Sequence, residues 1–408
     1  MVWLKIKLKN ILRWLAKATL KKYQPGIIGI TGSVGKTSTK EAIYTVLRNF
    51  RQVRASAKNF NNELGLPLTI LGDWQETDWI KIIFISFFRL IFGKKSDYPE
   101  MLILEYGADR PGDLDYLLDI AKPQIAVITA VGDVPVHVEY YDSPESVARE
   151  KAKIVRALPV AGFAVLNHDD QSVLDIKKSV SAPVFTFGFS EGAQMRISSF
   201  ENRSDNGRPS GIIFKLEYNN NSIPVRIDGA FGKSQAYAAA AAACVGVGFG
   251  FNLQRIAEAL AYYKPPPHRM KFFIGLKDTY IIDDCYNASP LSMRAALETI
   301  KDLSAKRKVG ILGDMLELGQ YTIEAHEQIG QLAAKTFNFL ITVGPRAKFI
   351  ADAARKKGMA EEKIRSFDTA DEAGMEILGL LKSGDLVLIK ASRGIQLDKI
   401  VKELAPVV

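Results

Sequence analysis

The chain has 408 residues, 47% of them hydrophobic, so it can bury a large core and form about two domains. Its two cysteines provide no disulfide framework, and a reducing cytoplasm is the expected compartment. The net charge is +9, but seven basic residues lie within residues 1–22, which contain no acid. The rest of the chain is close to neutral, which argues against a general nucleic-acid-binding surface.

The first segment, residues 1–25, predicts a basic amphipathic helix. Basic residues recur every four positions, and apolar residues fall on the adjoining face. The basic stripe is Lys5, Lys9, Arg13, Lys17 and Lys21, and the apolar face is Leu4, Leu8, Ile11, Leu12 and Leu15. Like charges at this spacing repel one another, and an anionic membrane surface would relieve the repulsion. The alternative is a helix that packs on its own domain with a solvated basic face.

Short apolar strands then alternate with helices. We expect strands at 27–31, 101–105 and 125–131, and helices at 36–50, 112–121 and 144–158. Unbroken apolar strands between helices predict a parallel sheet covered on both faces. Residues 184–228 instead contain short β-type runs and a polar turn region at 201–211, and the alanine-rich stretch 234–248 predicts a buried helix.

The stretch WIKIIFISFFRLIF, residues 79–92, does not fit a sheet of a soluble protein. As a helix it would be about 21 Å long, which is short of the roughly 30 Å hydrocarbon core of a membrane. Its polar residues Lys81, Ser86 and Arg89 share one arc of a helical wheel, which is typical of a helix lying in a membrane interface. The alternatives are an internal core helix and an oligomer contact.

The three prolines within residues 264–268 cannot continue a helix and mark the best candidate for a linker. Alternation of strands and helices resumes after them. Strands are expected at 279–284, 308–312, 339–344 and 385–390, and helices at 292–300 and 324–335. This pattern predicts a second, smaller α/β domain of Rossmann-like character.

The stretch GIIGITGSVGKTSTKEA has the context of a phosphate-binding loop, because it follows an apolar strand and begins a helix. It departs from the usual G-x-x-x-x-G-K-[ST] spelling, since Ile30 occupies the first glycine position. Gly32 and Gly35 let backbone N–H groups approach a phosphate. Lys36 can reach the β- and γ-phosphates, and the Thr37 hydroxyl can bind Mg²⁺. We therefore expect a nucleotide site here; the alternative is a glycine-rich turn without a ligand.

The spelling T-G-x-x-G-K-T resembles the Mur ligase family, ATP-dependent enzymes that join amino acids to peptidoglycan precursors. Further blocks resemble the members that add D-alanyl-D-alanine. They are NFNNELGLPLTIL (59–71), LEYGADRPGDLDYL (104–117), VAREKAKI (147–154), DDCYNASPLSMRAAL (283–297), GDMLELG (313–319) and IKASRG (389–394). The related folylpolyglutamate synthases usually read G-K-G-S where this chain reads G-K-T-S, so they fit less well.

The resemblance implies an α/β fold with a central P-loop ATPase domain built on a parallel sheet and a smaller Rossmann-like C-terminal domain. We expect a leader helix at 1–25, a central domain at 26–263 that includes the 79–92 insertion, and a ligase domain at 264–408. No counterpart of the family's N-terminal UDP-sugar-binding domain is expected. The implied reaction uses ATP and Mg²⁺: a substrate carboxylate attacks the γ-phosphate, and an amine then displaces phosphate from the acyl phosphate.

The resemblance also implies roles for individual residues. The expected nucleotide contacts are Gly32, Gly35, Lys36, Thr37, Ser38, Asn62, Arg269, Asp283, Tyr286 and Asn287. The expected metal ligands are Thr37, Glu105, His137 and Lys151, the last as a carbamate; Lys36, His137 and Lys151 are the expected catalytic residues. Lys390 and Arg393 are expected near the amine substrate. For Lys151, the alternative is a solvated helix lysine, and Cys285 receives no catalytic role.

Some positions differ from the family pattern. Asp109 replaces the asparagine of G-A-N, and three residues replace polar positions of G-x-H-N-x-x-N: Ser234, Gln235 and Ala238. The favoured interpretation is a monomeric, cytoplasmic amide ligase that adds D-alanyl-D-alanine or a similar amine to a peptidoglycan-precursor carboxylate. A second hypothesis keeps this chemistry with a membrane-linked or non-murein acceptor, and contact with the inner membrane face through 1–22 and 79–92 would suit it. A third is a nucleotide-binding regulatory protein without catalysis.

Overall fold

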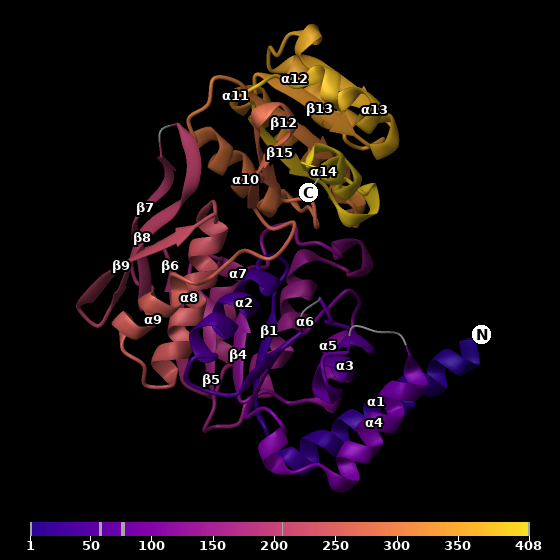
Figure 1. Cartoon of the computed structure of the whole chain (residues 1–408), viewed down its shortest axis with the longest axis vertical. Coiled ribbons are helices and arrows are strands. Elements are labelled where there is room, and N and C mark those ends of the chain that lie inside the picture. Colours follow the sequence, from indigo (N-terminus) through magenta and orange to yellow (C-terminus); the bar gives the residue numbers. More distant parts are fainter. Residues whose placement is uncertain (1, 57–58, 75–77, 206, 407–408) are drawn as a thin grey trace.

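The computed structural model describes residues 2–56, 59–74, 78–205 and 207–406, with side chains described from residue 6 onward. The chain forms two α/β units, each with its own sheet. Figure 1 shows the C-terminal unit at the top and the larger unit below it. The described residues between Leu260 and Lys271, which include the predicted linker, contain neither helix nor strand.

The larger unit contains a nine-stranded sheet of order β2-β3-β1-β4-β5-β6-β7-β8-β9. Its strands are β1 (Gly26–Thr31), β2 (Val53–Ala55), β3 (Met101–Glu105), β4 (Ile125–Ile128), β5 (Phe163–Asn167), β6 (Val184–Gly188), β7 (Met195–Asp205), β8 (Arg208–Tyr218) and β9 (Asn221–Asp228). Pairing is parallel from β2 to β7 and antiparallel from β7 to β9. The sheet is therefore mixed, and β7 and β8 are long strands where short runs were expected.

The polar stretch 201–211 belongs to the ends of β7 and β8 rather than to one long turn. This expectation was wrong because antiparallel strands can leave one face in water, so polar residues do not mark a turn there. The strand β4 also ends at Ile128, before the expected limit of residue 131.

Helices cover both faces of this sheet, which confirms the expected layering. They are α2 (Lys36–Leu47), α3 (Gly65–Leu71), α5 (Asp113–Ile120), α6 (Pro144–Arg156), α7 (Gln171–Ile176), α8 (Lys233–Gly248) and α9 (Leu253–Leu260). The core on one face is formed with α2, α8 and α9, and the core on the other with α3, α5, α6 and α7. The alanine-rich helix α8 is buried, as its composition predicts.

The smaller unit contains a six-stranded sheet of order β10-β11-β15-β12-β13-β14, parallel except for the pair β10 and β11. Its strands are β10 (Lys271–Gly275), β11 (Thr279–Asp283), β12 (Lys308–Gly313), β13 (Phe339–Val343), β14 (Ile364–Phe367) and β15 (Leu386–Lys390). One face is covered by α10 (Pro290–Asp302), α11 (Thr322–Thr336) and α12 (Lys348–Lys356), the other by α13 (Ala370–Leu380) and α14 (Asp398–Leu404). A second, smaller α/β unit is thus confirmed.

Short 3-10 turns complete the described elements. They are η1 (Lys95–Asp97), η2 (Val138–Tyr140), η3 (Lys177–Ser179), η4 (Leu276–Asp278), η5 (Gly319–Tyr321), η6 (Glu361–Lys363) and η7 (Arg393–Ile395).

The leader forms α1 (Val2–Tyr23) and the apolar stretch forms α4 (Trp79–Phe92), so both predicted helices are confirmed. They lie side by side and run in the same direction at the lower right of Figure 1. The Tyr23 hydroxyl donates to the Arg89 carbonyl oxygen at 2.7 Å, near the C-terminal ends of both helices. Leu12 and Leu15 of α1 share a small apolar core with Ile82 of α4.

The basic stripe of α1 is partly exposed and forms ion pairs with the protein itself. Lys9 Nζ lies 2.7 Å from Glu63 Oε1, and Arg13 and Lys17 both pair with Asp119. The alternative, a helix packed on its own unit with a solvated basic face, therefore fits these three residues, and acids of the same unit balance their charge. The side chains of Leu4 and Lys5 lie outside the described residues.

The polar residues of α4 are only partly directed inward, since Lys81 and Arg89 are exposed. Ser86 is buried, and the Arg89 guanidinium lies over the Trp74 ring and donates to the Leu71 carbonyl oxygen at 3.4 Å. The apolar face of α4 consequently points outward. Among the described residues, no helix is both long and apolar enough to cross a bilayer.

Candidate active site

The glycine-rich loop connects the end of β1 to the start of α2. Gly32 has φ of 141°, and a Cβ atom added there would lie 2.0 Å from Thr129 Oγ1, so only glycine fits this position. The Thr129 hydroxyl in turn donates to the Val34 carbonyl oxygen at 2.6 Å. Gly35 precedes the first residue of α2, with φ of 93°. The loop is therefore held against the end of β4, with the helix N-terminus turned towards an approaching anion.

Lys36 and Thr37 begin α2 and face the end of β3. Lys36 Nζ donates to the Gly32 carbonyl oxygen at 2.6 Å. Desolvation by the surrounding protein lowers the pKa of Lys36, and the negative charge of Glu105 partly opposes this effect. Thr37 Oγ1 lies 2.9 Å from Asn59 Oδ1 and 3.3 Å from Glu105 Oε2. A hydroxyl beside a carboxylate is a suitable pair of ligands for Mg²⁺.

Glu105 is buried at the end of β3 beside Lys40, a residue that no motif or spacing had indicated. Lys40 Nζ lies 3.3 Å from Glu105 Oε1 and donates to the Ser56 carbonyl oxygen at 2.5 Å. Within the described part of the chain, Glu105 Oε1 accepts no hydrogen bond. A buried carboxylate oxygen with spare acceptor capacity fits a bound cation.

Lys151 on α6 is 1% exposed. Burial lowers its pKa to about 7, and the nearby positive charge of Lys36 adds to this effect. The alternative of a solvated lysine was therefore wrong, because the apolar side of α6 turns this residue towards the loop. A buried lysine with such a pKa is neutral for much of the time near pH 7 and can react as an amine.

His137 joins the two units. Its Nε2 lies 3.2 Å from Asp109 Oδ1 in the larger unit, and its Nδ1 lies 2.6 Å from Glu317 Oε2 in the smaller unit. The hydrogen bond from His137 lowers the pKa of Glu317. The aspartate at position 109 thus provides a carboxylate partner for the histidine.

Arg269 and Tyr286 face the loop from the opposite side. The Arg269 guanidinium lies 4.0 Å from the centre of the Tyr286 ring, and its Nη2 lies 3.5 Å from Thr37 Oγ1. Gln235 of α8 donates to the Arg269 carbonyl oxygen at 3.1 Å and accepts from the Tyr263 hydroxyl at 2.6 Å. Gln235 therefore positions the backbone that carries Arg269.

A cavity of about 1020 Å³ lies between the two units. Its walls include Gly35 and Ser38 from the loop and Asn287 and Lys390 from the smaller unit. Two of the positions that differ from the expected motif, Ser234 and Ala238, also line it. The cavity is large enough for a nucleotide together with part of a second substrate.

Two family models match this chain. The Mur ligase middle domain matches residues 30–82 and 85–246, and the glutamate ligase domain of Mur ligases matches residues 268–393. The chain belongs to the Mur ligase family. This Mur ligase is accordingly an ATP-dependent acid–amino-acid ligase.

The Mur ligase is similar to curated UDP-N-acetylmuramoyl-tripeptide–D-alanyl-D-alanine ligases. It is 30% identical to that of Bacillus subtilis, with 96% of this chain and 79% of the relative covered. It is 31% identical to that of Mycobacterium leprae, with 94% and 74% covered. These relatives support the MurF-like character that the sequence blocks indicate.

Solved MurF structures have a similar fold. The MurF of Acinetobacter baumannii superposes with a TM-score of 0.80 at 25% identity, covering 96% of this Mur ligase and 79% of that chain. The MurF of Thermotoga maritima, solved in complex with ADP, superposes with a TM-score of 0.78 at 26% identity, with 97% and 83% covered. A folylpolyglutamate synthase of Mycobacterium tuberculosis superposes with a TM-score of 0.66 at 14% identity, which shows the fold alone.

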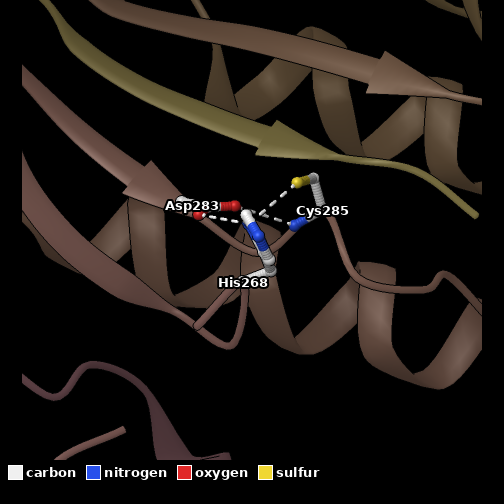
Figure 2. A group of neighbouring side chains, drawn as sticks. All are labelled: His268, Asp283 and Cys285. Atoms are coloured by element: carbon white, nitrogen blue, oxygen red, sulfur yellow. Dashed lines mark hydrogen bonds and ion pairs between the residues drawn. The ribbon is translucent and has the colours of Figure 1, made fainter. Parts of the chain in front are cut away.

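Asp283 and Asn62 have roles in holding the backbone. Figure 2 shows Asp283 directed at His268 of the linker, with 2.7 Å between Oδ2 and Nδ1. Its other oxygen accepts from the Cys285 backbone N–H at 3.2 Å. Asn62 Oδ1 accepts from the Gly65 backbone N–H at 2.9 Å at the start of α3. Neither residue lines the cavity between the units in the described structure, so their predicted nucleotide contacts remain predictions.

Lys390 lines the cavity, but its ammonium group is already paired. Lys390 Nζ lies 2.5 Å from Asp284 Oδ2 and donates to the Asn287 carbonyl oxygen at 3.0 Å. Lys390 therefore fixes the segment that carries Tyr286 and Asn287. Arg393 lies 5.7 Å from the centre of the Tyr286 ring and lines a second cavity together with Thr37, Arg269 and Tyr286.

Several residues of this site escaped the sequence reasoning. Asn59 and Glu317 lie inside the blocks 59–71 and 313–319, so the blocks themselves could have pointed to them. Asp284 lies beside the selected Asp283, and the strand pattern did not distinguish which carboxylate faces the cavity. Lys40 carries no sequence signal, because a lysine one turn beyond the loop is usually solvated.

Proposed function

We propose that this Mur ligase uses ATP and Mg²⁺ to join an amine, D-alanyl-D-alanine or a similar dipeptide, to a peptidoglycan-precursor carboxylate. One observation carries the proposal: Thr37 lies within 3.5 Å of both Glu105 and Arg269, and it lines one cavity together with Arg269 and Tyr286. The names of its relatives at about 30% identity support the substrate class. We include in this proposal a monomeric cytoplasmic enzyme with domains at 1–25, 26–263 and 264–408.

The residues of the loop suit phosphoryl transfer. The substrate carboxylate would attack the γ-phosphorus of ATP, which forms the acyl phosphate and breaks the bond to the oxygen that leaves with ADP. Lys36 and Arg269 are positioned to stabilise the negative charge that spreads over the phosphoryl oxygens. Thr37 and Glu105 would hold Mg²⁺, which neutralises phosphate charge. The amine would then attack the acyl carbon and expel phosphate, so one ATP is used for each amide formed.

Lys151 is proposed to act as a carbamate. Its neutral amine would add to CO₂, forming one N–C bond and releasing one proton. The product is an anionic oxygen donor in place of a cation beside Lys36. His137, held between Asp109 and Glu317, is proposed to act on the same side of the cavity as the metal. This arrangement suits a site in which two negatively charged substrates need fixed cations and oxygen ligands.

The experiment is a screen for phosphate release with purified enzyme. UDP-linked and lipid-linked peptide acceptors are combined with D-alanyl-D-alanine and with other amines, and the masses of the products are determined by mass spectrometry. We expect phosphate release that requires both acceptor and amine, and a product heavier by the dipeptide minus water. Release with lipid-linked acceptors alone would favour the second hypothesis, for which the outward apolar face of α4 is the supporting observation. ATP binding without amine-dependent release would favour a regulatory protein.

A further inference from the structure

The helices α1 and α4 form an exposed apolar surface, here called the α1–α4 face. It consists of Ile11, Trp14, Ile80, Phe84, Phe87, Phe88, Ile91 and Phe92, whose exposed fractions range from 41% to 83%. On α4 these residues recur at helical spacing and occupy one side. Ile11 falls on the side of α1 that also carries Lys22, which donates to the Arg89 and Leu90 carbonyl oxygens of α4. Both helices therefore contribute exposed apolar side chains to this part of the surface.

The packing of α4 makes this exposure unusual. A surface helix normally buries its apolar side and exposes its polar side. In α4 the buried residues are Ile82 and Ser86, while four phenylalanines remain exposed. The Phe88 and Phe92 rings lie 4.6 Å apart and contact each other on the outside. Scattered apolar side chains on a surface are ordinary, but a contiguous aromatic patch indicates a binding surface.

Basic residues accompany the face. Lys21 and Lys22 end α1, and Arg89, Lys94 and Lys95 lie at or just beyond the end of α4. The contact of Lys22 with α4 places these cationic ends beside each other. Residues 1–24 contain no acid, and the single acid within 78–95 is Asp78, whose side chain caps α4 by accepting from the Lys81 backbone N–H.

We propose that the α1–α4 face binds the surface of a bilayer that contains anionic lipid. Both helices would lie in the plane of the headgroups with the phenylalanines in the acyl boundary, which is the usual arrangement of basic amphipathic helices. A second copy of this chain suits the face less well, because a two-fold contact would bring two sets of lysines together. Among the described residues, no helix is long and apolar enough to cross the bilayer. The proposal does not depend on the identity of the acceptor.

The electrostatic attraction between the protein and anionic lipid would not come from the basic stripe of α1. Lys9, Arg13 and Lys17 pair with acids of the protein itself, so the cations that meet the lipid are those at the helix ends. Deletion of α1 is a poor test, because Leu12 and Leu15 are buried in the apolar core beneath α3 and α4. Substitutions of exposed residues test the surface without opening that core.

The experiment is co-sedimentation of the full chain with phosphatidylcholine vesicles that contain or lack phosphatidylglycerol. We expect binding that requires phosphatidylglycerol and weakens as sodium chloride is raised. The double variant Phe84→Ser, Phe92→Ser should bind about tenfold or more weakly, since two large apolar side chains no longer enter the bilayer. Lys94→Gln with Lys95→Gln should reduce the preference for phosphatidylglycerol.

The matched control is Val160→Ser with Met375→Ser, which removes two equally exposed apolar side chains away from the α1–α4 face. It should bind vesicles as the unaltered protein does. Melting temperature and ATP hydrolysis of each variant report whether it is folded. The proposal is overturned if the unaltered protein stays in the supernatant at low salt. It is overturned equally if the variant Phe84→Ser, Phe92→Ser binds vesicles as well as the control variant Val160→Ser, Met375→Ser. It is also overturned if Phe84→Ser, Phe92→Ser only converts a dimer to a monomer.

Discussion

His137 and Glu317 form a contact between the two units of the protein, with 2.6 Å between Nδ1 and Oε2. Both residues have positive φ, 68° and 63°, so each backbone is turned to present its side chain to the other. The Glu139 backbone N–H also donates to the Glu317 carbonyl oxygen at 3.4 Å. Through Glu317, the block GDMLELG therefore provides a contact between the smaller unit and His137 of the larger one.

Replacing Glu317 by glutamine should weaken this contact without changing its shape. We expect the dissociation constant for a non-hydrolysable ATP analogue to rise roughly two- to fivefold, because a partly exposed ion pair contributes up to about 1 kcal/mol. Isothermal titration calorimetry measures the change. Glu361→Gln, which removes an exposed ion pair with Arg355 in the smaller unit, is the control. Equal affinity in both variants would mean that His137 and Glu317 do not support the closed cleft.

Lys36→Ala should abolish turnover, because the transferring phosphoryl group loses its principal fixed cation. The loss should be about a hundredfold or more, as for the removal of one preorganised donor. A coupled assay of phosphate release measures it. Lys177→Ala, at a lysine remote from the loop, should retain full activity. Normal turnover in the folded Lys36→Ala variant would refute the assignment of the loop.

Lys151→Ala should lose activity, and acetate or formate should restore part of it by supplying a carboxylate where the carbamate oxygens would lie. Lys153→Ala is the matched control, because Lys153 lies on the same helix but its ammonium group pairs with Asp115 and Glu150. That control should remain active and show no response to acetate. Full activity of Lys151→Ala without any added carboxylate would remove this residue from the site.

The pH dependence follows from the same lysine. The pKa of Lys151 is about 7, and only the neutral amine can add CO₂. Protonation increases as the pH falls through this value, so activity at fixed total bicarbonate should decline on the acidic side of about pH 7. The acetate-rescued Lys151→Ala variant has no titrating amine and should lack this decline. A pH profile of kcat/KM for both proteins tests the assignment, and superimposable profiles would contradict it.

Nucleotide binding should draw the two units together, because Thr37 and Arg269 contribute to one site from opposite sides of the linker. Small-angle scattering of the free enzyme and of its complex with a non-hydrolysable ATP analogue measures the change. We expect a smaller radius of gyration in the complex. An unchanged radius in the presence of saturating analogue would argue for a cleft that does not open.

The sequence was sufficient for the parts of the site that depend on local pattern. Lys36 and Thr37 could be placed because a strand, a glycine-rich turn and a helix follow one another directly. Lys151 could be selected through its resemblance to a family lysine, but its burial depends on helices packed from distant segments. The choice between Asp283 and Asp284 depends on one residue of strand register, which periodicity does not determine.

The outward apolar face of α4 could not be predicted for a similar reason. A helical-wheel projection of residues 79–92 gives the width of the polar arc, but it does not show which side of the helix packs against the rest of the protein. Trp74 and the Leu71 carbonyl group provide partners for Arg89, and Ser86 is buried with Ile82, so the side of α4 that meets the protein overlaps the polar arc. The ion pairs of the α1 basic stripe could not be predicted, because Asp119 and Glu63 come from segments that sequence spacing does not bring near it.

Residues 59–63 connect the proposed nucleotide site to the surface on which α1 packs. Asn59 accepts from Thr37, Phe60 packs into the apolar core with Leu12, and Glu63 pairs with Lys9. The packing of α1 and the binding of ATP would therefore be thermodynamically coupled. If ATP stabilises the arrangement of residues 59–63 that packs against α1, the packed α1 must increase the affinity for ATP by the same factor. A chain shortened by its first helix would bind ATP more weakly although every residue that touches the nucleotide is intact.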